Sequence, residues 1–291
     1  MDLKNHITSL LKDAIDPKLE VFSMNTLGGG CINQASKINT SHGPFFLKSN
    51  AQCPPDIFLR EAESLEALAR AGSSLKIPKV LVKTSLGENP AILITEYLEG
   101  PEHYQDLDGA LGQGLAELHQ YTHDQFGFYH DNYCGATLQN NQWNNKWLDF
   151  FLQQRIWYLV EMITKRRNLG GHEIKLYEKF ILEPPSCLQH GPKPSLIHGD
   201  LWSGNYMPSN QGPAIIDPAS AFTDREFEFS IMNMFGGFSQ KVWDTYDEIY
   251  PLTPEWKERS DIYMLYHYLN HYYLFGGGYG QQATSIVKRY V

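Results

Sequence analysis

The stretch that most limits what this chain can fold into runs from Leu196 to Asn205. Its apolar start is typical of a short buried strand, and the polar residues that follow are typical of a loop. Asp200 lies in that loop, and Asn205 follows five residues later. Twelve residues beyond Asn205, a second short apolar run ends in Asp217. A fold that brings the two strand ends together would collect two carboxylates and an amide in one place.

The spacing of these three side chains matches that of a kinase catalytic loop followed by a metal-binding Asp. The spacing has a mechanical reason. Asp200 has to face the attacking hydroxyl, whereas Asn205 and Asp217 have to hold a Mg²⁺ ion that also touches the nucleotide phosphates. We therefore predict a phosphotransfer site with Asp200 as the catalytic base and with Asn205 and Asp217 as metal ligands. The alternative is that all three are ordinary loop residues and helix caps.

A glycine run between two strand-like stretches is a candidate phosphate-binding loop, made by Gly28, Gly29 and Gly30. Glycines let backbone N–H groups approach phosphate oxygens without a Cβ in the way. Alone this signal is weak, because many hairpins use glycines. Asn33 also stands where the G-x-G-x-x-G pattern has its third glycine, and no Walker A motif occurs.

Two charged residues after the glycine run strengthen the prediction. Lys48 ends an apolar strand, and Glu61 lies on the next predicted helix, at about 56–71. In kinases such a lysine contacts the α- and β-phosphates and is held by a helix carboxylate. Glu63 is a rival for the role of Glu61. The alternative without a function is that Lys48 lies at a solvated strand end and Glu61 on a solvated helix face.

The expected elements divide near residue 98 into a strand-rich lobe, 1–98, and a mostly helical lobe, 99–291. Strands are expected at 20–27, 31–40, 45–48, 80–82 and 92–95, and a packing helix at 2–16. Later helices are expected at 106–121, 146–165, 173–182, 225–234, 239–249 and 254–275. This organisation predicts an α+β, two-lobe, protein-kinase-like fold. Its connector, with Glu96, Tyr97 and Leu98, is expected to offer backbone groups to an adenine edge.

The charge balance limits the partners. A formal net charge of −9 and a pI near 5.6 argue against nucleic acid, which needs a basic face, and suit a cationic substrate. The four cysteines form no C-x-x-C pair, so a reducing compartment is expected. The first residues do not resemble a signal peptide, and no run is long enough to span a membrane. We expect a cytoplasmic protein with no membrane partner.

The octet His198 to Asn205, followed by Asp217-Pro218-Ala219-Ser220, resembles the fructosamine/ketosamine 3-kinase family, in the aminoglycoside-phosphotransferase-like branch of the kinase fold. Further matching segments, at 28–32, 58–68, 234–238 and 268–271, extend the resemblance over nearly the whole chain. It implies ATP- and Mg²⁺-dependent phosphorylation of the O3 hydroxyl of ketosamines, either free or on protein lysines. Fructosamines, ribulosamines and erythrulosamines form that substrate class. Because the 3-phosphate destabilises the adduct and frees the amine, the implied role is deglycation.

Several residues are candidates for substrate contact. Trp202 lies two residues past the base, where an indole could stack on a sugar face, with packing as the alternative. The family pattern implies that His271 reaches the substrate, although core packing is the default for it and for His267, one turn before it. Three acids near the start of a later helix could offer charge to the amine or form a solvated helix start: Asp224, Glu226 and Glu228.

Two residues, Cys31 and Gly199, raise the question of regulation. Cys31, in the glycine loop, is a redox candidate, because backbone N–H groups and Lys48 could lower its thiol pKa. Its oxidation would block nucleotide binding or link two chains into a dimer, and an otherwise monomeric protein is the alternative. Gly199 stands where protein kinases have an arginine that binds an activation-loop phosphate, so we expect no phosphorylation switch.

Two other functions remain open. One is a kinase of the same fold that acts on another small alcohol, such as an aminoglycoside, choline or homoserine. Residues 202–204 and 218–220 argue against it. The other is a nucleotide-binding pseudokinase that regulates a partner, against which the intact set of Lys48, Asp200 and the two metal-ligand candidates argues.

Overall fold

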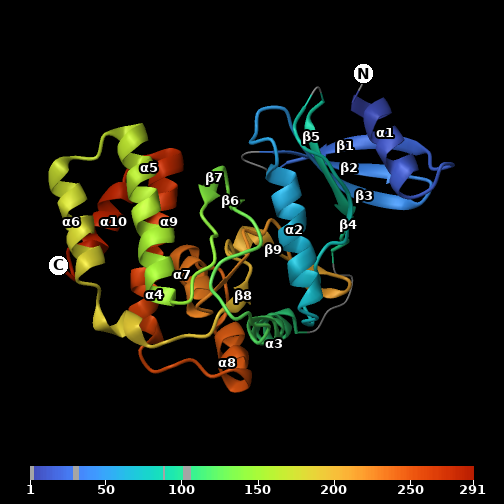
Figure 1. Cartoon of the computed structure of the whole chain (residues 1–291). Coiled ribbons are helices and arrows are strands. Elements are labelled where there is room, and N and C mark those ends of the chain that lie inside the picture. The colour runs from blue at the N-terminus through green and yellow to red at the C-terminus, as the bar shows by residue number, and fades with distance from the viewer. Residues whose placement is uncertain (1–2, 29–32, 88, 101–105) are drawn as a thin grey trace.

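The structure is a computed structural model that describes residues 3–28, 33–87, 89–100 and 106–291 (Figure 1). A five-stranded sheet with two helices forms one lobe, and the other lobe is mostly helical. The α+β, two-lobe, protein-kinase-like prediction is thereby confirmed. We propose that the lobes divide near residue 98, between the last strand of the sheet and the first helix of the second lobe. No helix in the described part of the chain combines the length and apolar character needed to cross a bilayer.

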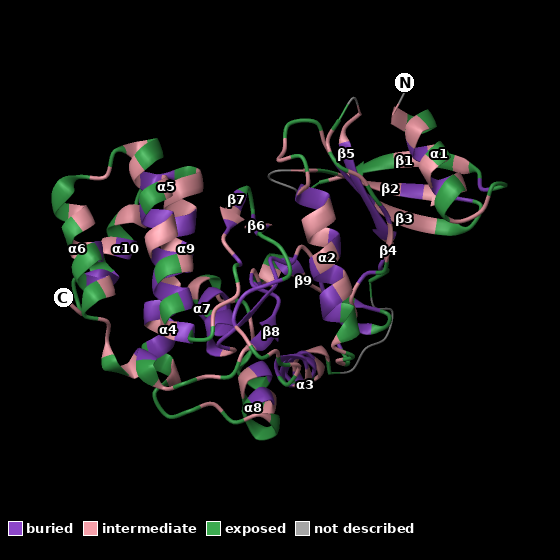
Figure 2. Ribbon diagram, in the orientation of Figure 1, coloured by how far each residue is buried: buried purple, intermediate pink, exposed green. Residues whose placement is uncertain are grey.

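The sheet of the first lobe has the strand order β1-β2-β3-β5-β4, and all of its neighbouring strands are antiparallel. Its strands are β1 (Val21–Leu27), β2 (Gln34–Thr40), β3 (Gly43–Asn50), β4 (Val80–Lys83) and β5 (Ala91–Glu96). β5 is buried on both faces, as Figure 2 shows, and pairs with β3 and β4.

The two helices of this lobe, α1 (Leu3–Ala14) and α2 (Ile57–Arg70), pack against different sides of the sheet. Ile92 and Ile94 of β5 belong to the cluster under α1, whereas Ala91 and Leu93 belong to the cluster under α2. This alternation follows from the two-residue period of a strand. On β3, Leu47 packs with the α1 cluster, so the next residue, Lys48, faces α2.

The second lobe is built around α9, against which α5, α7 and α10 pack. Its helices are α3 (Leu107–His119), α4 (Trp147–Asp149), α5 (Tyr158–Arg167), α6 (Gly171–Leu182), α7 (Glu226–Phe235), α8 (Gln240–Ile249), α9 (Trp256–Phe275) and α10 (Tyr279–Val287). Three short antiparallel pairs complete it: β6 (Asn132–Cys134) with β7 (Thr137–Gln139), β8 (Ser195–Ile197) with β11 (Ala221–Thr223), and β9 (Tyr206–Ser209) with β10 (Gly212–Ile215).

The long helix expected at 146–165 is interrupted. Residues Phe150–Trp157 form a π-helix between α4 and α5. This segment buries Arg155, whose guanidinium donates to Asn140 O and Asn141 Oδ1 and lies 4.4 Å from the ring centre of Phe150. The Arg155 guanidinium is therefore buried beside aromatic rings, and the periodicity of the sequence does not predict a buried cation here. The β6–β7 hairpin and α10 were likewise not predicted.

Candidate active site

The predicted catalytic loop leaves β8 and lies against the segment that carries Asp217. The ring of His198 links the two: Nε2–H donates to Ile216 O at 2.8 Å, and Nδ1 accepts from Asp200 N at 3.3 Å. Burial lowers the pKa of His198, which favours this neutral ring. Ala219 N also donates to His198 O, at 2.9 Å. Through these contacts His198 buttresses the catalytic loop against the segment that carries Asp217.

Gly199 has a positive φ of 85°, where residues with a Cβ are strained. A Cβ at this position would also collide with the carbonyl of Ala219. Both features explain why a glycine occupies the position of the protein-kinase arginine. The backbone here is held from below by Glu228, whose carboxylate accepts from the N–H groups of His198 and Gly199.

Asp200 and Asn205 lie together at the end of this loop. The side-chain NH₂ of Asn205 donates to Asp200 O at 2.8 Å and to Asp200 Oδ2 at 3.3 Å. Burial, followed by the charges of Asp217 and Glu228, raises the pKa of Asp200 well above its usual range. A carboxylate with such a pKa accepts a proton more readily than an ordinary surface Asp.

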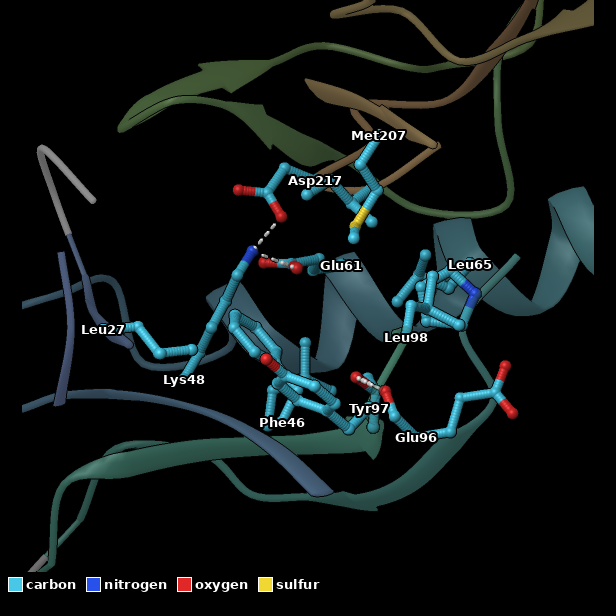
Figure 3. A pocket seen from close by; sticks show the side chains of 14 residues that line it. Leu27, Phe46, Lys48, Glu61, Leu65, Glu96, Tyr97, Leu98, Met207 and Asp217 are labelled. Carbon is cyan, nitrogen blue, oxygen red and sulfur yellow. Dashed lines mark hydrogen bonds and ion pairs between the residues drawn. The ribbon is translucent and has the colours of Figure 1, made fainter. Parts of the chain in front are cut away.

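Lys48 joins the two lobes across the cleft (Figure 3). Its ammonium contacts Glu61 Oε1 at 2.6 Å and forms a second ion pair with Asp217 Oδ1. Burial opposes the charged lysine, but Asp217 and Glu61 outweigh it, so the pKa of Lys48 is raised. The rival Glu63 instead accepts from Arg60 at 3.0 Å and lies 2.6 Å from His130 Nδ1. The geometry therefore brings Lys48, Glu61 and Asp217 together.

A mostly apolar pocket adjoins Lys48 and reaches the connector after β5. Glu96, Tyr97 and Leu98 all line it, opposite Met207 (Figure 3). The main chain of Glu96 is already engaged: its N–H donates to Lys79 O at 2.9 Å, and its carbonyl accepts from the Thr95 hydroxyl at 3.1 Å. Its carboxylate pairs with Lys76. The expected adenine contacts would therefore come from Tyr97 and Leu98 more readily than from Glu96.

A second, larger cavity shares Lys48, Glu61 and Asp217 with the first. Gly28 and Asn33 line it from the glycine-run side, and the residues of the catalytic loop that line it are Asp200, Trp202, Gly204 and Asn205. The β6–β7 hairpin contributes Asn132, Tyr133 and Gly135. The predictions for Gly29, Gly30 and Cys31 lie outside the described residues.

The oxygen atoms in this second cavity suit a hard cation. Because the Asn205 NH₂ group is bound to Asp200, its Oδ1 is the atom left to act as a ligand. One oxygen of Asp217 pairs with Lys48, and the side chain is partly exposed. Amide and carboxylate oxygens are the ligands Mg²⁺ prefers, together with phosphate oxygens. The residues present thus fit the predicted ion.

Of the two predicted substrate residues, Trp202 and His271, only Trp202 is among the described residues that line the cavity. The Trp202 indole lines it and lies so close over Gly204 that a Cβ there would collide with the ring. His271 is not among the described residues that line it. The His271 ring lies 5.3 Å from that of Phe235, which lies 6.0 Å from that of Trp202. His267 is buried and stacks on Phe227.

The three acids near α7 do not form a solvated helix start, because all are buried. Asp224 accepts from the Tyr263 hydroxyl at 2.6 Å, and Glu226 pairs with Arg259 through both of its oxygens. Asp224, Glu226 and His190 lie close enough to share a cation, but Arg259 already neutralises Glu226. Neither they nor Glu228 are among the described residues that line the cavity.

The sequence did not identify two features of this site. Glu228 supports the catalytic loop, and Tyr133 lines the cavity while its hydroxyl donates to Asp56 Oδ1. The sequence did hold a signal for the role of Glu228, because acids alternate with phenylalanines over 226–229. A carboxylate that is buried among aromatic rings needs hydrogen-bond donors. No local signal marks the second, because its partners are 77 positions apart.

Fold and site together define an ATP-dependent phosphotransferase of the protein-kinase-like class. An aminoglycoside phosphotransferase shares this fold, with a TM-score of 0.64 at 16% identity over 98% of both chains. The family model for fructosamine kinase matches residues 3–291, and the chain belongs to that family.

Relatives agree with this membership. A chloroplastic protein-ribulosamine 3-kinase of Oryza sativa subsp. indica is 37% identical over 94% of this chain and 80% of its own. A protein of Vibrio parahaemolyticus named "Probable ketoamine kinase" is 36% identical over 98% of both. A crystal structure of a candidate fructosamine-3-kinase from Haemophilus somnus has a TM-score of 0.87 at 26% identity, over 98% of this chain and 96% of its own.

Proposed function

We propose that this chain transfers the γ-phosphoryl group of ATP to the O3 hydroxyl of ketosamines and so promotes deglycation. The observation that carries the proposal is the double ion pair of Lys48 with Glu61 and Asp217, in a cavity that Asp200 also lines. This arrangement supports phosphoryl transfer by positioning and electrostatics. The substrates are fructosamines, ribulosamines or erythrulosamines, free or on protein lysines.

Each residue of the site has one task in this reaction. Lys48, oriented by Glu61, binds the α- and β-phosphates, and Gly28 lines the same cavity on the phosphate side. Asp200 orients the sugar hydroxyl and accepts its proton. Asn205 and Asp217 would hold Mg²⁺, which supplies positive charge to the phosphates when bound.

The substrate side rests on two aromatic groups. Trp202 lines the cavity two residues beyond Asp200, and we assign it to the sugar face. His271 donates from Nδ1 to His267 O at 2.8 Å, so its Nε2 is left to accept a hydrogen bond. We assign that nitrogen to a substrate that extends past Phe235. We further place the protein in the cytoplasm, with no nucleic-acid or membrane partner.

The test is to incubate the protein with ATP, Mg²⁺ and ribulose-lysine or fructose-lysine and to locate the phosphate by NMR. Phosphate on O3, absent with Asp200→Ala at unchanged ATP affinity, supports the proposal. Turnover of an aminoglycoside, choline or homoserine in place of both adducts would favour a kinase of another alcohol. ATP binding without turnover of any acceptor would favour a pseudokinase.

Oxidation at Cys31 stays a prediction from the sequence, as does the dimer linked through it. Peroxide treatment followed by non-reducing electrophoresis and an ATP-binding assay tests both. We expect Cys31→Ala to abolish the effect of peroxide on ATP binding, whereas Cys53→Ala should retain it. Equal peroxide sensitivity of Cys31→Ala and the unmodified protein would contradict a redox role for Cys31.

A further inference from the structure

A row of aromatic rings begins at the wall of the larger cavity and leads away from it. We call this cavity, which Asp200 and Trp202 line, the acceptor cavity. Trp202 is 41% exposed, Phe235 is 43% exposed and Phe275 is 61% exposed. The ring of His271 joins the last two, at 5.3 Å from Phe235 and 5.7 Å from Phe275. Tyr279 also contacts His271, at 5.1 Å. We call these five residues the aromatic row.

The row is built where three helices end or begin. α7 ends at Phe235, α9 ends at Phe275, and α10 begins at Tyr279. The loop after α7 lies directly on the catalytic loop, because a Cβ on Gly237 would touch the side chain of Ser203. The position of the row relative to Asp200 is therefore fixed by packing.

Large exposed aromatic side chains that touch one another mark binding surfaces more often than single exposed ones do. Three of the seven large exposed hydrophobic side chains of the described chain belong to the row. Burial lowers the pKa of His271, at the centre of the row, which favours its neutral ring. The row thus presents apolar and π surface without a charge of its own.

The chemistry of a ketosamine sets what must lie along such a surface. The amine is on C1, and the reacting hydroxyl is on C3 of the same short chain. When the hydroxyl faces Asp200, the amine and everything attached to it have to leave the cavity nearby. Trp202, two residues after the base, lies on the cavity wall. A protonated amine is attracted to the face of an indole, and an alkyl chain packs on the phenyl rings that follow.

We propose that the aromatic row binds the amine carrier of the substrate, and that this carrier is a glycated lysine side chain in a peptide with apolar neighbours. The inference rests on the proposed function and deepens it from ketosamines in general to peptide-borne ones. Phe235, whose ring lies next to the Trp202 indole that faces the sugar, receives the alkyl arm of the lysine. Phe275, the most exposed ring, receives the apolar residue beside that lysine.

The experiment compares two acceptors, free ribulose-lysine and a short peptide that carries one ribulated lysine next to phenylalanine. With the unmodified protein, KM should be lower for the peptide at similar kcat. Phe275→Ala should raise KM for the peptide about fivefold, since one aromatic contact is lost, and leave the free adduct unchanged. Phe22→Ala is the matched control, because Phe22 is also 61% exposed but lies on β1. It should change neither KM.

A second measurement does not depend on turnover of the peptide. The same peptide without the sugar should compete with free ribulose-lysine, and Phe275→Ala should weaken that inhibition. The inference is overturned when the peptide has the same KM as the free adduct, or when Phe275→Ala changes both acceptors alike. If neither acceptor is phosphorylated, the proposed function itself fails. The two failures are therefore distinguishable.

Discussion

The hydroxyl of Tyr133 donates a 2.7 Å hydrogen bond to Asp56 Oδ1, and this bond connects the two lobes. Tyr133 belongs to the β6–β7 hairpin on the acceptor side of the cleft, which lies beside α2 in Figure 1. Asp56 immediately precedes α2, the helix that carries Glu61. This side-chain contact therefore runs from a wall of the acceptor cavity to the start of the helix that positions Lys48.

Removal of this hydroxyl should weaken nucleotide binding at a distance. We expect Tyr133→Phe to raise the KM for ATP several-fold, because α2 loses a tether worth about 1 kcal/mol. A double-mutant cycle with Asp56→Asn should give a coupling energy of similar size. Tyr129→Phe, in the segment before the hairpin, serves as the control. Additive effects of the two substitutions would show that the bond does not couple the lobes.

The choice between the two carboxylates of α2 can be measured directly. Glu61 contacts the buried ammonium of Lys48, whereas Glu63 pairs with Arg60 and His130 near the surface. Glu61→Gln should lower kcat at least tenfold, because Lys48 is then held by Asp217 alone. Glu63→Gln should change kcat less than twofold, because Glu63 pairs with Arg60 and His130 and not with Lys48. Steady-state kinetics would decide, and equal losses would refute the assignment of Glu61.

The glycine in the catalytic loop provides a test that separates backbone strain from collision. Gly199 and Gly43 both have positive φ, 85° and 96°, but only Gly199 has a carbonyl in the place of the missing Cβ. Gly43→Ala should cost about 1 kcal/mol of unfolding free energy, which is the strain alone. Gly199→Ala should cost at least 2–3 kcal/mol and abolish turnover, since the loop has to move. Urea denaturation of both variants gives the comparison, and similar costs would contradict it.

A buried histidine should make the stability depend on pH. Burial lowers the pKa of His267 to about 3, whereas the unfolded chain protonates near 6.5. Between these values the unfolded state binds one proton more, so stability falls as the pH is lowered below about 6.5. The contribution is about 1.4 kcal/mol per pH unit in this range. His267→Phe should reduce this slope in denaturation curves from pH 7 to pH 4. The exposed His172→Gln should leave it unchanged, and an unaltered slope in His267→Phe would contradict the prediction.

Residues with a fixed local spacing could be read from the sequence. The spacing of five positions from Asp200 to Asn205 fits one tight loop, and Lys48 is recognisable because it ends an apolar strand after a glycine run. The structure gathers Lys48, Glu61 and Asp217 as these signals indicate. The helices of the second lobe were found because their apolar residues recur every three or four positions.

Features that depend on distant partners could not be read in this way. The β6–β7 strands have three residues each and contain Asn132 and Gln139, which are rare in strands but are hydrogen-bonded to each other here. Arg155 in the π-helix is bound by acceptors of Asn140 and Asn141, which lie outside that helix and which no local pattern indicates. Asp224 and Glu226 resemble a solvated helix start unless the positions of Tyr263 and Arg259 are known.

Because side chains of β3 and β5 alternate between the faces under α1 and α2, the register of these strands also decides whether the site can form. If β3 slipped by one residue against β5, Leu47 would point at the nucleotide. The ammonium of Lys48 would then be buried in the hydrophobic cluster under α1. Such a chain would lose its core together with its activity. A chain that folds in the correct register therefore places Lys48 on the nucleotide side without any further adjustment.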